Sequence, residues 1–126
     1  MPAVTALRPE ATPQLVLGKA TVRAAEMLGL SGAALSRVIG LSAPTISRIH
    51  HGDKGIDPAS KEGELALMLV RVFRGLDALV GHDDQKRLLW MRSANRALGG
   101  EPIKLIERAD GLVAVLNYLD GMRAPA

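Results

Sequence analysis

Three side chains that can bond to the bases of DNA lie close together in the sequence, at Thr45, Ser47 and Arg48. A guanidinium group can donate two parallel hydrogen bonds to guanine, and short hydroxyl or methyl groups can contact thymine or a phosphate. The other polar candidates in this segment suit contacts to the DNA backbone, and they are Arg37, Ser42, His51 and Lys54. We therefore expect this segment to bind DNA.

A helix-turn-helix over residues 31–52 would position these side chains. Apolar residues at helical spacing predict a buried face on each helix: Leu35, Val38 and Ile39 in the first, Ile46 and Ile49 in the second. Gly40 can adopt the left-handed conformation of a tight turn, and Ser42 can cap the second helix. Because the two isoleucines face inward, the three base-reading candidates should face solvent, as on a recognition helix.

The composition of the chain excludes several classes of protein. Its 126 residues allow one domain or two small ones, and the hydrophobic fraction of 48% predicts an ordinary globular core. The chain contains no cysteine, which excludes disulfides and thiolate metal sites and favours a cytoplasmic protein. No apolar stretch approaches the roughly 20 residues that span a bilayer, so we expect no membrane segment. The net charge of +3 is compatible with phosphate binding.

Helical spacing predicts an all-α fold in two parts. A loose N-terminal arm over residues 1–11 should precede a helix-turn-helix domain over 12–58, and a second helical domain should cover 61–126. The helices expected outside the helix-turn-helix are 15–28, 61–80, one from Asp83 to Leu98, one beginning at Pro102, and a final helix capped by Asp110. The apolar helix over 61–80 suits either a dimer interface or the centre of the fold.

A distinctive pattern occupies residues 90–123, which read WMRSANRALGGEPIKLIERADGLVAVLNYLDGMR. It contains a helix with a Trp, an Asn, a Leu-Gly-Gly-x-Pro turn and a Gly-led terminal helix. The matching positions are Trp90, Asn95, Leu98, Gly99, Gly100, Pro102, Gly111, Leu116 and Leu119. In this pattern the second half of the chain resembles the toxin-binding domain of the Xre/MbcA/ParS antitoxin family. The first half resembles the Xre-like helix-turn-helix.

This resemblance implies a type II antitoxin whose partner is a RES-domain toxin, which consumes NAD or modifies proteins with ADP-ribose. It implies that the antitoxin covers the toxin's active site and represses its own operon. The residues implied to lie nearest the toxin are Asn117, Tyr118, Asp120 and Arg123. DNA half-sites related by two-fold symmetry would require a homodimer.

Other interpretations remain open at this point. The chain could be a stand-alone regulator of the phage-repressor kind, or it could have lost DNA binding and kept only toxin inhibition. We expect no enzymatic activity and no cofactor, because the sequence offers no nucleophile and base in a recognisable pattern. His50 and His51 point about 100° apart on a helix, so we expect no metal site there. Trp90 is interpreted as a core residue.

Overall fold

The computed structural model describes residues 12–123, and within that range it is all-α, as predicted. The helices are α2 (Pro13–Leu28), α3 (Gly32–Ile39), α4 (Ala43–His50), α5 (Lys61–Leu79), α6 (Asp84–Arg92), α7 (Pro102–Leu105) and α8 (Ala109–Arg123). The arm expected over residues 1–11 lies outside the described range. None of the described helices is long and apolar enough to cross a membrane.

Small polar residues define where the N-terminal helices begin. The hydroxyl of Thr12 accepts a hydrogen bond from the amide of Leu15, so α2 begins at Pro13 rather than at Leu15. Ser31 caps α3 in the same way through the amide of Ala34, at 3.0 Å. A helix that begins with its amides satisfied needs less stabilisation from packing.

The turn between α3 and α4 has the expected geometry. Gly40 ends α3 with a φ of 76°, a left-handed conformation that costs a residue with a Cβ atom about 1 kcal/mol or more. The hydroxyl of Ser36 donates to the carbonyl of Leu41, which ties α3 to the turn. The predicted inner faces are confirmed, because Ile46 and Ile49 are only 6% and 3% exposed.

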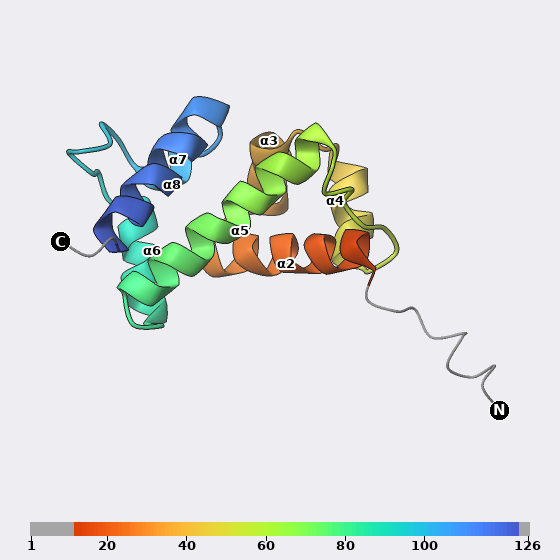
Figure 1. Cartoon of the computed structure of the whole chain (residues 1–126), viewed down its shortest axis with the longest axis horizontal. Helices are drawn as coiled ribbons and strands as arrows, with labels where there is room; N and C mark the ends of the chain where they lie inside the picture. Colours follow the sequence, from red (N-terminus) through yellow and green to blue (C-terminus); the bar gives the residue numbers. More distant parts are fainter. Residues whose placement is uncertain (1–11, 124–126) are drawn as a thin grey trace.

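Helix α5 forms the centre of the molecule, with α2 packed on one side and α8 on another (Figure 1). Ser60 caps it by accepting a hydrogen bond from the amide of Gly63, at 2.9 Å. Its packing therefore favours the central-helix interpretation of this apolar segment. Leu67 and Leu79 are the large apolar side chains that α5 leaves exposed within the described range, at 44% and 39%.

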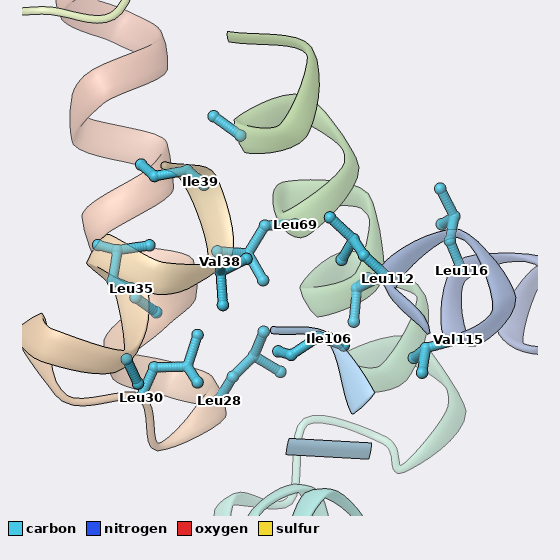
Figure 2. Packing of buried hydrophobic residues seen from close by; sticks show 14 of the residues in the cluster. Leu28, Leu30, Leu35, Val38, Ile39, Leu69, Ile106, Leu112, Val115 and Leu116 are labelled. Carbon is cyan, nitrogen blue, oxygen red and sulfur yellow. The ribbon is translucent and has the colours of Figure 1, made fainter. Parts of the chain in front are cut away.

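A single aliphatic core runs through both predicted parts of the chain (Figure 2). Val38 of α3 and Leu69 of α5 lie close together in it, and Ile106 and Leu112 extend it toward α8. Burial of a Leu or Ile side chain contributes about 1.5 to 3 kcal/mol to the free energy of unfolding. The helix-turn-helix and the C-terminal helices are therefore held by the same apolar contacts.

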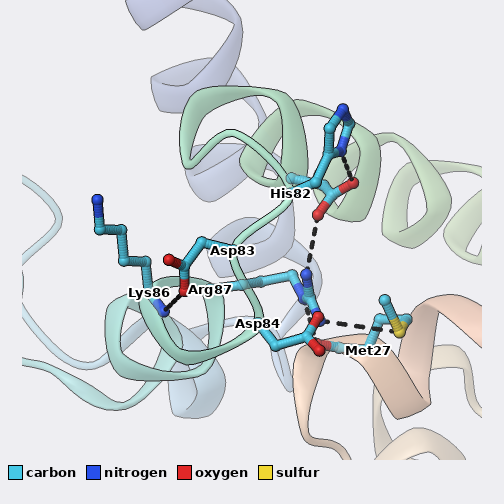
Figure 3. A network of polar contacts seen from close by, with 7 residues as sticks. Met27, His82, Asp83, Asp84, Lys86 and Arg87 are labelled. Atoms are coloured by element: carbon cyan, nitrogen blue, oxygen red, sulfur yellow. Dashed lines mark hydrogen bonds and ion pairs between the residues drawn. The ribbon is translucent and has the colours of Figure 1, made fainter.

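A buried arginine adds a polar joint between α2, α5 and α6 (Figure 3). The guanidinium of Arg87 donates to the carbonyl of Met27 at 2.7 Å and to the carboxylates of Asp77 and Asp84 at 2.8 and 2.6 Å. His82 bonds the second oxygen of Asp77, at 2.5 Å. The side chain of Arg87 is only 3% exposed. Its hydrogen bond to Met27 holds the end of α2 against the start of α6.

Helix α6 ends at Arg92, so the helix expected to continue to Leu98 was predicted too long. Ser93 is extended, and Asn95 and Gly100 form an isolated antiparallel bridge that closes a tight turn. The side-chain oxygen of Asn95 accepts a hydrogen bond from the amide of Leu98, at 3.2 Å. This local bond competes with continued helix, a known tendency of asparagine.

The prediction that Asp110 caps the final helix was also wrong. Helix α8 begins at Ala109, which places Asp110 inside the first turn. Its carboxylate accepts hydrogen bonds from the amide of Gly111 at 2.9 Å and from Arg108 at 3.1 Å. A negative charge remains favourable there, because it lies near the positive end of the helix dipole.

Candidate functional site

The outer face of α4 carries the residues that were predicted to read bases. Ser47 and Arg48 are exposed, because burial of Ile46 and Ile49 turns them to the opposite side. Thr45 is half-buried instead. Its hydroxyl oxygen accepts a hydrogen bond from the hydroxyl of Ser42 at 2.9 Å. These two side chains lie at the N-terminal end of α4 and fix the start of the helix.

The end of α4 presents further polar groups on the same side. Nδ1 of His51 donates to the carbonyl of Ser47 at 2.7 Å, which leaves Nε2 for an outside partner. His51 follows Ser47 by one helical turn, so the two side chains share a face with Arg48. Lys54 is exposed in the loop that follows. Ser47, Arg48 and His51 therefore share one face of α4, and Lys54 lies in the loop that follows this helix.

Arg37 lies apart from this group. Its Nε and Nη2 atoms donate to the two carboxylate oxygens of Glu107, at 2.5 and 3.3 Å. These hydrogen bonds hold the pKa of Glu107 below its ordinary value. The predicted backbone contact of Arg37 therefore competes with an ion pair that joins α3 to the segment before α8.

The four residues implied to contact a toxin do not form one exposed face of α8. Asn117 is exposed on its outer face. Tyr118 points toward α6 and stacks on Trp90, with ring centroids 6.2 Å apart. Asp120 points toward α5 and pairs with Arg71 at 3.0 Å. Arg123 is exposed at the end of the helix, beside Gly75.

Trp90 is less buried than its interpretation as a core residue requires. It is half-buried, and it packs against the core only at the edge. The final helix, α8, continues through Arg123. Residues 124–126 lie outside the described range.

Two of the implied residues, Asn117 and Asp120, belong to a surface along the junction of α5 and α8, and its other side chains were not indicated by the sequence. The Arg71–Asp120 ion pair joins the outer faces of the two helices. One turn earlier on α5 lies Leu67, 44% exposed, and two turns earlier on α8 lies Val113, 39% exposed. We call this surface the α5–α8 seam, formed by Leu67, Arg71, Val113, Asn117 and Asp120. No pattern within either helix predicts it, because it depends on how the helices pack.

The fold and the α4 surface define a helix-turn-helix protein of the DNA-binding class. Residues 8–71 match a model of the antitoxin Xre-like helix-turn-helix domain, and residues 75–124 match a model of the antitoxin Xre/MbcA/ParS C-terminal toxin-binding domain. The chain belongs to the Xre/MbcA/ParS antitoxin family. It is a toxin-antitoxin system antitoxin with a DNA-binding domain. None of the curated proteins matches the chain.

Proposed function

We propose that this antitoxin neutralises a RES-domain toxin by covering its active site, and that it represses its own operon as a homodimer through α4. The RES partner is proposed from the family resemblance. The observation that carries the two activities is the separation of their surfaces, with α4 and α8 on opposite sides of α5 (Figure 1). One chain can therefore hold a protein and DNA at the same time.

The α5–α8 seam supports the proposed toxin contact. It combines two exposed apolar side chains, Leu67 and Val113, with the amide of Asn117. It also contains the Arg71–Asp120 pair at 3.0 Å. Apolar side chains surrounded by a few polar groups are the composition expected at the centre of a protein interface. Residues 75–124 match a toxin-binding domain, and α8 contributes most of the seam.

A bulky charge at the outer face of α8 tests the toxin contact. We expect Asn117→Arg to weaken toxin binding at least about tenfold, because the longer side chain opposes close approach at a central position. Gln85→Arg is the matched control, since it makes the same change in charge on an exposed position of α6. Co-expression with the adjacent toxin gene should show lost growth rescue only for Asn117→Arg. Unchanged rescue and affinity would place the contact elsewhere.

A single substitution on α4 tests the DNA contact. We expect Arg48→Ala to cost about 1 to 3 kcal/mol in operator binding if the guanidinium bonds to a base. Arg96→Ala is the control, since Arg96 is exposed in the turn after α6. Equal affinities in a mobility-shift assay would exclude Arg48 from base recognition. An operator bound without any toxin gene nearby would favour the stand-alone repressor.

The homodimer has its own test. A two-fold dimer on DNA requires half-sites about 34 Å apart or a multiple of that distance. Light scattering on the free antitoxin and footprinting on the operator should give a dimer mass and a palindromic footprint of that spacing. A monomer at all concentrations with a single half-site footprint would contradict the dimer.

A further inference from the structure

A basic hollow lies beside the recognition helix, between α2 and the end of α4. It has a volume of about 610 Å³ and an opening to solvent. Lys19 and Arg23 of α2 line it together with Lys54 from the loop after α4, and the rings of His50 and His51 also border it. Glu26 is the carboxylate in this lining. The charge of the hollow is therefore predominantly positive.

The packing of the loop fixes the backbone around this basic hollow. The amide of Ile56 donates to the carbonyl of Gln14 at 2.9 Å, which attaches the loop to the start of α2. Ile49 and Ile56 are each only 3% exposed. Lys19 and Arg23 are one helical turn apart, so they project from the same face of α2. The basic hollow is thus held by core contacts rather than assembled from mobile side chains alone.

The basic hollow is continuous with the outer face of α4. His51 borders the hollow and also shares the outer face with Ser47 and Arg48. Within residues 12–123, neither Lys19 nor Arg23 forms an ion pair, so their charges are available to an outside anion. In homeodomains, the end of the recognition helix is a place where the DNA backbone is contacted.

We propose that the basic hollow binds the sugar-phosphate backbone of DNA, with Lys19 and Arg23 of α2 each contacting a phosphate. The apolar part of its lining, which includes Leu15, Val16 and Val22, suits the deoxyribose rings between the phosphates. This inference rests on the proposed DNA binding and extends it from α4 to α2. Such contacts set affinity and position on the duplex without reading sequence.

Salt dependence tests this inference, because each phosphate neutralised by a cation releases bound counterions. The slope of log affinity against log salt changes by about 0.9 for each contact. We expect the double variant Lys19→Gln/Arg23→Gln to lower the slope by about 1.8. The reduction should be the same on a duplex from upstream of the antitoxin gene and on a mixed-sequence duplex of equal length. Fluorescence anisotropy over a series of KCl concentrations measures the slope on both duplexes.

The matched control is Lys86→Gln/Arg96→Gln, which removes one lysine and one arginine from exposed positions on and after α6. It should keep the wild-type slope, and thermal unfolding should show that both double variants are folded. If Arg48→Ala weakens operator binding but Lys19→Gln/Arg23→Gln leaves the slope unchanged, the basic hollow does not bind DNA although α4 does. If the α2 variant loses toxin affinity instead, the hollow is a protein contact and the inference is overturned. A wild-type protein that binds neither duplex would contradict both the inference and the proposed DNA binding.

Discussion

The two carboxylate oxygens of Glu107 accept hydrogen bonds from Nε and Nη2 of Arg37, across 70 positions of the sequence. Arg37 lies on α3 of the helix-turn-helix, and Glu107 lies between α7 and α8. The pair therefore connects the helix-turn-helix with the segment that leads into α8. The carboxylate of Glu107 also neutralises the charge of Arg37, a residue that was predicted to contact the DNA backbone.

Removal of the charge on Glu107 should strengthen DNA binding. In Glu107→Gln the guanidinium of Arg37 has no anionic partner, so it can contact a phosphate. One added contact steepens the slope of log affinity against log salt by about 0.9. The control is Glu101→Gln, which removes a neighbouring carboxylate that pairs with Lys104 at 3.6 Å. If both variants keep the wild-type slope in anisotropy titrations, Arg37 does not reach the DNA.

Loss of the buried guanidinium should destabilise the whole fold. Arg87→Ala removes the partner of Asp77 and leaves the carbonyl of Met27 without its hydrogen bond. We expect a loss of about 3 kcal/mol in the free energy of unfolding, the low end for a buried pair, since Asp77 keeps some contact with water. Lys86→Ala, an exposed neighbour on α6, should change it by less than about 0.5 kcal/mol. Urea unfolding measures both, and equal midpoints would contradict a structural role for Arg87.

The contacts of Asp77 with His82 and Arg87 lead us to expect a loss of stability in acid. Hydrogen bonding from His82, and then from Arg87, lowers the pKa of Asp77 below its ordinary value. A lowered pKa in the folded state means that the stabilisation is complete above the unfolded pKa, near 3.8, and is lost as pH falls through the folded pKa. Asp77→Asn should be less stable at neutral pH, but its stability should fall less steeply in acid. Urea unfolding from about pH 5 down to about pH 2 tests this, and parallel curves would refute it.

Much of the helix-turn-helix could be predicted because its signals are local. Ser31, Gly40 and Ser42 each act on a backbone group within a few residues, and the spacing of Ile46 and Ile49 determines which side of α4 is exposed. The end of α6 at Arg92 was missed because the usual local stop signals are absent there. No glycine or proline lies between Arg92 and Leu98, and the helix stops because of hydrogen bonds that Asn95 makes in the turn.

Contacts between residues far apart in the sequence could not be predicted in this way. Arg71 and Asp120 are 49 positions apart, and only the packing of α5 beside α8 makes them partners. A cationic residue on a helix is usually solvated, and no sequence pattern indicated that Arg87 is buried. Its burial follows from three acceptors supplied by separate helices. Pairings of this kind depend on the assembled core, and the sequence pattern of one helix does not contain them.

Gly111, in the first turn of α8, offers a test of how this helix is positioned. A Cβ atom at Gly111 would lie 1.9 Å from the carbonyl oxygen of Leu105, a backbone atom that cannot move alone. Gly111→Ala must therefore displace α8 from α7, and we expect a loss of about 3 kcal/mol in the free energy of unfolding. This close approach gives a physical reason for the glycine at position 111 of this chain.

Gly121→Ala is the matched change on the same helix, because a Cβ atom there would meet nothing within 4 Å. Alanine forms helix more readily than glycine, so this variant should gain up to about 1 kcal/mol. The urea unfolding midpoints of Gly111→Ala and Gly121→Ala should therefore move in opposite directions. In growth rescue, Gly111→Ala should also lose toxin neutralisation at temperatures where it is still folded, since the seam on α8 is displaced. Stability and rescue both at wild-type levels in Gly111→Ala would mean that α8 does not depend on this contact.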